Sequence, residues 1–332
     1  MAPVMKFLFF SFTYTSGLLF TTFFCALFYA RHDFITPNLI LSGINILLIL
    51  FFPVVHLLGS PLWIREQFLN FYFLAFLVQG LLLAVVFLWK SHSINRITLP
   101  GKPELRKLFH YSVYALLANV VFFLLYRIDY WFVRNICSVC KEGDLGNYIQ
   151  VSKVGQIFLI VPAIIASAIF PRTAAGFREQ VNSSMQVVSR FVFFTYLLVV
   201  LLLVFIGKRL FPFVYGDTFR DMYLPFLWLS PGILSLSVLA FLSAYNAGKD
   251  RVMINLVGAL LALVVIVIGD ILLIPRYGII AAAMVSSLGY LSNLVYALYH
   301  FKKEYNSNLA SFFIPGRSDV DRIKTIFLAS KD

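Results

Sequence analysis

Long apolar runs follow one another along almost the whole chain, and they leave few folds open to it. A helix of about 20 residues is long enough to cross a hydrocarbon core about 30 Å thick. Of the 332 residues, 61% are hydrophobic and only 13% are charged, whereas a soluble domain is about 25% charged. Because a helix satisfies its own backbone hydrogen bonds inside lipid, the sequence predicts an all-α, polytopic membrane bundle.

We expect nine membrane spans, separated by polar breaks. Their approximate ranges are 7–30, 34–59, 68–89, 111–135, 147–170, 187–207, 223–245, 252–274 and 278–300. Several contain Pro or Gly, which transmembrane helices tolerate because neighbouring groups re-satisfy the freed backbone. The first run follows Lys6 but is too long for the core of a signal peptide, and no small-residue cleavage site follows it before Arg31. We therefore expect this helix to stay in the protein.

The distribution of basic residues predicts the orientation. The loops on one side, together with the C-terminal tail, carry about twice as many Lys and Arg residues as the loops on the other. Basic loops are retained in the cytoplasm, so we expect the C-terminus there. The net charge of +12 then follows from topology, and no nucleic-acid partner is expected.

The longest polar break divides the chain. It contains Pro100, Gly101 and Pro103 among charged residues. We predict four parts: a partial N-lobe of three spans at 1–89, a cytoplasmic linker at 90–110, a C-lobe of six spans at 111–300, and a cytoplasmic tail at 301–332. In the tail, "DVDRIKTIFLAS" has apolar residues at helical spacing, which favours a short helix at the membrane surface.

An internal repeat crosses this division. Residues 31–50 align without a gap with residues 248–267, and two polar pairs coincide. The pairs are Asp33 with Asp250 and Asn38 with Asn255. In both copies a charged turn joins two spans and a third follows, so 1–89 is equivalent to the second half of a six-helix lobe. We expect about three helices to be missing from the front; the alternative is that the first methionine is genuine and the repeat is due to chance.

The cysteines and histidines indicate neither a metal site nor an enzyme. Three cysteines cannot form a four-ligand zinc site, and no histidine lies close to Cys137-Ser-Val-Cys140. For that motif we favour an ordinary outward loop, with a small disulfide as the alternative; we take Cys25 as a small apolar residue. The sequence has no Gly-rich phosphate loop and no HExxH motif, so we predict a non-enzyme without metal or cofactor.

The stretch "LLYRIDYWFV" at 124–133 places Arg127 and Asp129 within an apolar run, and Lys153 lies at a similar depth in the next span. Ionisable residues inside spans usually face the bundle interior or an aqueous path. Arg127 and Asp129 point about 200° apart around a helix, so they face different environments. We favour Asp129 pairing with Lys153 while Arg127 points into a water-filled cavity; the reverse assignment is the alternative.

A second alternative is that Arg127 and Lys153 extend to the outer headgroups. If they line a cavity, two cations against one carboxylate suit an anionic substrate, and a guanidinium binds phosphate through paired hydrogen bonds. Four further candidates each have an alternative. Tyr126 and Tyr130 stack on sugars or simply pack, Asn119 lines the same cavity or bonds to another helix, and Asp270 couples an ion or caps a helix end.

Three stretches together resemble a known family. They are "LRKLFHYSVYALLANVVFFLLYRIDYWFVRNI", "LGNYIQVSKVGQIFLIVPAIIASAIFPRTA" and "AYNAGKDRVMINLVGALLALVVIVIGDILLIPRYGIIAAAMVSSLGYL". They are similar to the C-lobe of Wzx-like polysaccharide, or O-antigen, flippases of the multidrug/oligosaccharidyl-lipid/polysaccharide exporter superfamily. The resemblance covers about 104–300, while 1–89 looks like the second half of the N-lobe.

The resemblance implies an inverted-V, MATE-like transporter in the bacterial inner membrane. It would move undecaprenyl-diphosphate-linked oligosaccharide to the periplasmic leaflet for lipopolysaccharide or another surface polysaccharide. Its partners would be that lipid-linked glycan, membrane lipids and other polysaccharide-assembly proteins. Arg127 and Lys153 would meet the diphosphate or acidic sugars, Asp129 would hold a helix or a basic partner, and Arg172 would lie at the cytoplasmic mouth. The family's first helix has no counterpart in this chain.

Three other functions are alternatives for this sequence. A multidrug exporter of the same superfamily favours an acidic cavity for organic cations, opposite in sign to the one expected here. A membrane glycan polymerase or ligase usually has a large periplasmic loop, and the outward loops of this chain are short. A truncated fragment without transport activity is the third.

Overall fold

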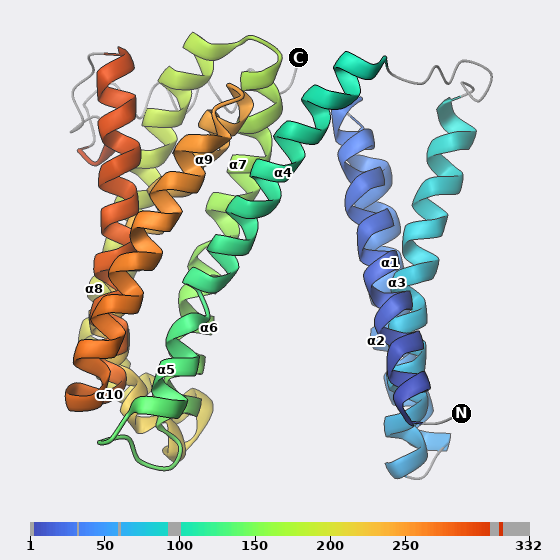
Figure 1. Cartoon of the computed structure of the whole chain (residues 1–332). Coiled ribbons are helices and arrows are strands. Elements are labelled where there is room, and N and C mark those ends of the chain that lie inside the picture. The colour runs from blue at the N-terminus through green and yellow to red at the C-terminus, as the bar shows by residue number, and fades with distance from the viewer. Residues whose placement is uncertain (1–2, 32, 59–60, 92–100, 306–311, 315–332) are drawn as a thin grey trace. The chain divides into compact units, whose positions relative to one another are not determined.

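The computed structural model describes residues 3–31, 33–58, 61–91, 101–305 and 312–314. All regular elements of these residues are helices (Figure 1). The chain divides after Pro100 into two compact units, which we call unit 1 (1–100) and unit 2 (101–332). The predicted all-α membrane fold is confirmed, and the division falls inside the predicted linker.

Unit 1 contains α1 (Pro3–Ala30), α2 (Ile35–Leu58) and α3 (Pro61–Ser91). Its small core consists of Cys25, Phe28 and Leu83. The helices α1 and α3 approach closely at two glycines. A Cβ on Gly17 would lie only 2.4 Å from the Phe76 carbonyl carbon, and one on Gly80 only 2.8 Å from the Gly17 carbonyl oxygen.

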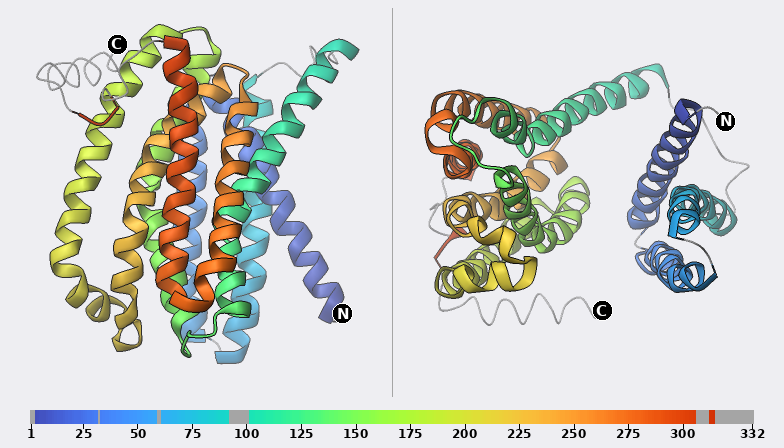
Figure 2. Two further views of the ribbon diagram at one scale, coloured as in Figure 1. Left: turned by 60° about the vertical axis from the view of Figure 1, so that its left-hand side comes forward. Right: turned by 90° about the horizontal axis from the view of Figure 1, so that it is seen from below.

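Unit 2 holds the larger core, and most of its helices lie side by side with roughly aligned axes, whereas the helix at 102–125 leans away from them at one end (Figures 1 and 2). Its elements are α4 (Lys102–Leu125), α5 (Ile128–Ile136), α6 (Asp144–Phe158), α7 (Ile160–Ala174), α8 (Arg178–Tyr215), the 3-10 helix η2 (Asp217–Met222), α9 (Tyr223–Gly248) and α10 (Val252–Tyr305). Helix α9 contacts α6, α7, α8 and α10. Its apolar residues are therefore buried on nearly all sides, as at Val238, Phe241 and Leu242.

Helix α10 consists of two antiparallel arms (Figure 1). The chain reverses at Gly278, whose φ of 61° and ψ of −143° break the helix. Pro275, which lacks an N–H and clashes with the preceding turn, favours the end of the first arm there. The arms pack closely through small residues: a Cβ on Gly269 would lie 2.6 Å from Val285 Cγ1, and one on Gly289 would lie 2.5 Å from Ile266 Cγ1.

Two predicted spans are broken, which corrects the sequence prediction. The span 147–170 is the pair α6 and α7, bent by 43°. Pro162 explains the position, because its ring clashes with the carbonyl four residues earlier, at Phe158, where α6 ends. The span 111–135 begins earlier, at Lys102, where the Glu104 carboxylate accepts a hydrogen bond from the Gly101 amide (3.0 Å).

That second span is also interrupted, between α4 and α5. The break lies at Tyr126 and Arg127, where no proline or glycine marks it in the sequence. It places Asp129 in the first turn of α5, where the Tyr130 amide donates a hydrogen bond to the Asp129 carboxylate (2.9 Å). A carboxylate in a first turn is stabilised by the helix dipole, which gives the break a physical basis.

The predicted number of nine spans is not confirmed. Among the described residues, six helices are long and apolar enough to cross a membrane, or seven if the bent pair α6 and α7 is one span. Ile35–Phe51 is a shorter apolar helix. This count takes α10 as one helix, although the chain reverses at Gly278. A count of long helices therefore gives fewer membrane spans than the two arms of α10 would provide.

The predicted repeat has a counterpart in the hydrogen bonds. The Tyr29 hydroxyl donates to Asn38 Oδ1 (3.3 Å), and Asn246 Nδ2 donates to Asn255 Oδ1 (3.4 Å), at equivalent positions of the two copies. Each unit also ties its charged turn to the end of the next antiparallel helix. Lys90 pairs with Asp33 (3.0 Å), and Glu304 pairs with Lys249 and Arg251. The charges are reversed between the units, so the geometry repeats while the residues differ.

The tail is described only in part. Helix α10 continues past the predicted end at 300 to Tyr305. Phe312 is buried and packs edge-on against Phe301, with ring centroids 5.0 Å apart. The predicted surface helix in "DVDRIKTIFLAS" lies outside the described residues.

Candidate functional site

Five polar residues meet in the interior of unit 2. They are Asp129 of α5, Tyr148 of α6, and Asp270, Ser286 and Tyr290 of α10, and we call them the polar centre. Each is at most 5% exposed. Polar groups inside a membrane bundle are costly unless they are satisfied or functional.

Asp129 is the best satisfied of the five. The Tyr148 hydroxyl donates to Asp129 Oδ2, and the Ser286 hydroxyl donates to the same oxygen (3.1 Å). Oδ1 accepts from the Tyr130 amide. The predicted pairing of Asp129 with Lys153 is therefore wrong: in the described chain no ion pair joins them, and hydroxyl groups take the place of the cation because Lys153 lies on the exposed side of α6.

Asp270 contrasts with Asp129. It is fully buried, and neither carboxylate oxygen has a hydrogen-bond partner among the described residues. Ile266 and Ile274, one turn away on either side, are also fully buried. Asp270 lies close enough to Asp129 to interact with it electrostatically. Two carboxyl groups therefore share an interior that offers hydrogen-bond donors to only one.

The tyrosine rings surround this centre. Tyr126 packs against Tyr290 with centroids 5.9 Å apart, and Tyr130 packs edge-on against Tyr148 at 5.7 Å. Tyr126 and Tyr290 line a narrow crevice that also includes Ser152 and Gln156. Tyr126 and Tyr130, for which the sequence allowed either packing or stacking on sugars, thus make packing contacts inside unit 2.

Arg127 and Lys153 both have exposed side chains. Arg127 precedes the end of α5 at Ile136 by nine residues, and Lys153 follows the start of α6 at Asp144 by nine. At 1.5 Å per residue both lie about 14 Å from the same end of the unit. The Arg127 guanidinium lies over the Phe123 ring, 5.6 Å from its centroid. The structure places these two cations at a common depth and, unlike the predicted pairing of Lys153 with Asp129, outside the polar centre.

Asn119 and Arg172 lie elsewhere on unit 2. Asn119 is exposed on α4, and its Nδ2 donates to the Ala115 carbonyl of its own helix (2.9 Å). Arg172 is exposed in the last turn of α7. The structure does not bring either side chain to the polar centre.

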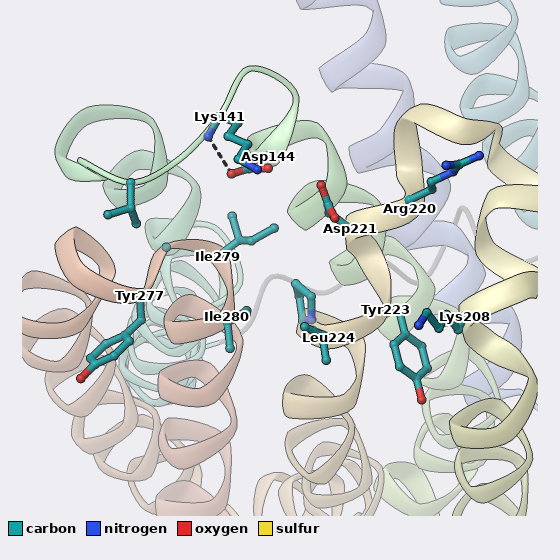
Figure 3. Close-up of a pocket in the computed structure, with 13 residues that line it drawn as sticks. Lys141, Asp144, Lys208, Arg220, Asp221, Tyr223, Leu224, Tyr277, Ile279 and Ile280 are labelled. Atoms are coloured by element: carbon teal, nitrogen blue, oxygen red, sulfur yellow. Dashed lines mark hydrogen bonds between the residues drawn. The ribbon is translucent and has the colours of Figure 1, made fainter.

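A cavity of about 420 Å³ opens at the end of unit 2 where α5 and α6 are joined (Figure 3). Its wall combines Lys141 and Asp144 with Lys208 and Arg220 from the other side. Arg220 is already paired with Asp217 (2.8 Å). The two lysines then stand against two aspartates, because Asp221 also lines the wall, so the cavity has no clear excess of either charge. It is distinct from the polar centre.

The loop between α5 and α6 carries a disulfide between Cys137 and Cys140. The preference for an ordinary loop at this motif is therefore wrong. The spacing alone could not decide, because pairing depends on how the chain turns after α5. Cys25 is a free, buried cysteine, as expected of a small apolar residue.

Sequence reasoning missed Tyr148, Ser286 and Tyr290. Tyr148 lies in the stretch "LGNYIQ", and Ser286 and Tyr290 lie in the apolar stretch "AAAMVSSLGYL". Isolated hydroxyl groups in apolar helices are a weak signal, since they also serve in ordinary helix packing. Only the packing of α6 against the second arm of α10 shows that Tyr148 and Ser286 share the Asp129 carboxylate. The Tyr290 hydroxyl donates instead to the Leu125 carbonyl (3.5 Å).

The fold and the buried centre define a polytopic helical membrane protein with the architecture of a MATE transporter. The Vibrio cholerae MATE transporter VcmN, in an aspartate-to-asparagine mutant, is similar with a TM-score of 0.72 and 13% identity. The lipid II flippase MurJ in an inward closed conformation is similar with a TM-score of 0.57 and 15% identity. The matches cover 91% and 94% of this chain, which spans 70% and 65% of the lengths of those two proteins.

A sequence family is matched as well. The family model described as polysaccharide biosynthesis protein matches residues 73–224. No curated protein matches the sequence. The family match supports the predicted resemblance to polysaccharide biosynthesis proteins over residues 73–224, and the two structures show the predicted MATE-like fold.

Proposed function

We propose that this protein is a membrane flippase of surface polysaccharide biosynthesis and that it carries polyprenyl-diphosphate-linked oligosaccharide, such as an O-antigen precursor. The observation that carries the proposal is the pair of exposed cations, Arg127 and Lys153, at one depth on adjacent helices. The match to polysaccharide biosynthesis proteins supports it. It is a transport function, and no covalent step is assigned to the protein.

The diphosphate suits these two side chains. A guanidinium donates paired hydrogen bonds to phosphate oxygens, and an ammonium adds a point charge. Because both residues lie about 14 Å from the end of the helices, neutralising them with an anionic substrate lowers the cost of holding charge at that depth. Asp129 accepts hydrogen bonds from hydroxyl groups and does not neutralise these two cations. The anionic substrate supplies the negative charge instead.

The remaining candidates have secondary roles in this proposal. Arg172 attracts the diphosphate at the cytoplasmic mouth, and Asn119 contributes a polar contact to the glycan on the exposed side of α4. Tyr126 and Tyr130 position the backbone around Arg127 through their packing. The chain acts in the bacterial inner membrane with its C-terminus in the cytoplasm, beside other polysaccharide-assembly proteins.

We propose that Asp270 and Asp129 couple transport to a cation, of which a proton is the simplest. An ionised carboxylate without a partner is very costly in an apolar interior. Asp270 has no hydrogen-bond partner among the described residues, so it requires a proton or a bound cation. Loading and release of that charge would bias the conformation of unit 2.

The substrate role is tested with Arg127→Ala, and Arg134→Ala, on the helix α5 that follows Arg127, serves as the matched control. Surface polysaccharide and inner-leaflet lipid-linked oligosaccharide are measured in the producing cells, with protein level checked by immunoblot. We expect Arg127→Ala to reduce export at least tenfold and to accumulate the precursor, while Arg134→Ala exports normally. Normal export by Arg127→Ala at normal protein level would count against the proposal.

The coupling role is tested separately in proteoliposomes. Flipping of a lipid-linked oligosaccharide is followed under an imposed proton gradient or an imposed Na⁺ gradient. Asp270→Asn, which keeps the shape but not the charge, is expected to remove the gradient dependence, whereas Asp217→Asn at the surface keeps it. Unchanged dependence in Asp270→Asn refutes the coupling role and leaves the substrate role intact.

The multidrug alternative is judged in the same vesicles. An exporter of organic cations requires an acidic contact surface, whereas Arg127 and Lys153 are exposed cations. Uptake of a fluorescent organic cation by the wild-type protein, without flipping of the glycan lipid, would favour that alternative.

A further inference from the structure

Two pairs of helices turn back and touch at one end of unit 2, which we call the disulfide end. The first pair is α5 and α6, joined by the loop that carries Cys137 and Cys140. The second pair is the two arms of α10, joined at Gly278. A Cβ on Gly278 would lie 3.4 Å from Val139 Cγ2, 3.5 Å from Cys140 Sγ and 3.7 Å from Cys137 Sγ. The disulfide loop therefore rests directly on the turn of α10.

The polar centre lies at the same distance from both tips. Four of its residues are eight positions from a tip: Asp129 before Cys137, Tyr148 after Cys140, Asp270 before Gly278, and Ser286 after Gly278. At 1.5 Å per residue Asp129, Asp270 and Ser286 lie about 12 Å along their helices, and Tyr148 lies four residues after the start of α6 at Asp144, about 6 Å along it. A shift of one tip against the other is thus transmitted along short, rigid helix segments to the centre.

The hydrogen bonds of the centre cross between these two pairs. The Ser286 hydroxyl lies 3.1 Å from Asp129 Oδ2 and 3.3 Å from the Tyr148 hydroxyl oxygen. Both distances are already longer than the usual O–H···O range of about 2.5–3.0 Å. A sliding of about 1 Å between the tips would break these bonds, because a contact of about 3.6 Å or more is no longer a hydrogen bond.

We propose that Cys137 and Cys140 are positioning residues for the polar centre: their disulfide fixes the tip of α5 and α6 against the turn of α10, and reduction releases it. Reduction breaks the S–S bond and adds two electrons and two protons, giving two thiols. A dithiol or phosphine reductant supplies the electrons and is itself oxidised. The proposal that the disulfide positions the polar centre does not depend on the proposed function. Any effect of the disulfide on transport rests on that function.

The first test reads the Tyr148 hydroxyl directly. Fluorotyrosine is incorporated at Tyr148 of the full chain in lipid nanodiscs, and its fluorine NMR resonance is recorded before and after reduction with a phosphine. We expect reduction to shift or broaden the resonance and the Cys137→Ser/Cys140→Ser variant to give the reduced spectrum. Cys25→Ser, which alters the free cysteine of unit 1, is expected to leave the resonance unchanged.

An unchanged resonance would overturn the proposal, provided that mass spectrometry shows the gain of two hydrogens. If the double serine variant does not fold, the reduced wild-type chain supplies the same state. The test remains decisive in either preparation.

The second test asks whether the disulfide acts through the centre. Thermal unfolding is measured for Ser286→Ala, for the double serine variant and for their combination. We expect each alone to lower Tm by about 2–4 °C and the combination to lower it by clearly less than the sum, because coupled residues are not additive. Strict additivity would mean that the disulfide stabilises the loop alone, and would contradict the positioning role.

Transport separates the two proposals. If the wild-type chain flips no lipid-linked oligosaccharide, the proposed function fails while the fluorine and unfolding results still decide the positioning. If it does flip the lipid, we expect reduction to slow it several-fold in wild type and to have no effect on the double serine variant. A reductant effect of the same size in the double serine variant would refute an effect of this disulfide on transport.

Discussion

Arg127 and Asp129 are two positions apart, yet one is exposed and the other is 1% exposed. The sequence predicted this divergence from the rotation of about 200° between two residues of a continuous helix. In the structure the helix is broken at Arg127, so the break also contributes to it. The partner of Asp129 was not predictable, because the choice between Lys153 and hydroxyl groups depends on which face of α6 meets α5. That face is set by the buried Tyr148 and Val151.

Tyr148→Phe tests the hydroxyl that satisfies Asp129. The variant keeps the ring and removes one donor from a buried carboxylate, so we expect unit 2 to lose about 1–2 kcal/mol of stability. Thermal unfolding in detergent measures this. Tyr299→Phe, whose ring is 60% exposed, is the matched control and should be neutral. Equal Tm values for Tyr148→Phe and wild type would show that the bond contributes nothing.

Asp33 in unit 1 gives a prediction about pH. Hydrogen bonds from the backbone and side chain of Thr36, and then from Lys90, lower the pKa of Asp33 to about 2. An unfolded aspartate titrates near about 3.9, so its contribution is present above about pH 4 and is lost as the pH falls toward about 2. We expect Asp33→Asn to destabilise unit 1 at neutral pH and to lose part of the acid sensitivity.

The measurement for Asp33 is amide hydrogen exchange of α1 and α2 peptides across that pH range, after correction for the intrinsic exchange rate. The difference between wild type and Asp33→Asn should shrink as the pH falls. A difference that stays constant down to about pH 2 would show that ionisation of Asp33 is not responsible.

At the scale of elements, apolar length predicted where helices lie but not where they break. Pro162 is visible in the sequence, yet other prolines, such as Pro231 in α9, lie inside helices that are not split. The break before α5 has no proline or glycine and follows from the buried contacts of Asp129. Tertiary contacts therefore decided both the α4–α5 boundary and the site beside it.

The crossing of α1 and α3 gives an element-scale prediction. Gly17→Ala would place a Cβ 2.4 Å from the Phe76 carbonyl carbon, and backbone atoms cannot rotate away, so the helices must separate. We expect a loss of about 1–3 kcal/mol. Gly43→Ala in α2, where nothing lies within 4 Å, should be neutral or slightly stabilising because alanine favours helix. Hydrogen exchange of unit 1 peptides measures both, and equal behaviour of the two variants would contradict the close crossing.

At the scale of the whole molecule, the two units repeat a geometry with different chemistry. Tyr29 bonds to Asn38 in one unit and Asn246 to Asn255 in the other. The sequence alignment found the asparagines because they are identical, but not the ion pairs, because Lys90–Asp33 and Glu304–Lys249 exchange the positions of acid and base. Where the acidic and the basic residue of an ion pair change places between two repeats, a sequence alignment does not match them, and only the structure shows that the pairs correspond.

The disulfide and the predicted orientation lead to a final prediction about the membrane. Gly278, which contacts the disulfide, and Tyr305 are the two ends of one straight arm of α10, about 40 Å apart at 1.5 Å per residue. That distance equals the thickness of a bilayer with its headgroups, so the disulfide and Tyr305 lie on opposite sides. The excess of basic residues predicts that Tyr305 is cytoplasmic, and the disulfide then faces the oxidising side, where it can persist.

We therefore expect a fluorescent protein fused after Asp332 to fold in the cytoplasm. In intact cells, a membrane-impermeant maleimide should label Cys137 and Cys140 only after treatment with an impermeant reductant. The Cys137→Ser/Cys140→Ser chain is the control for labelling at Cys25. Labelling without reductant would mean that the disulfide does not form in the cell. Labelling only after the membrane is permeabilised, with reductant present throughout, would reverse the orientation and with it the direction of transport inferred from the basic loops.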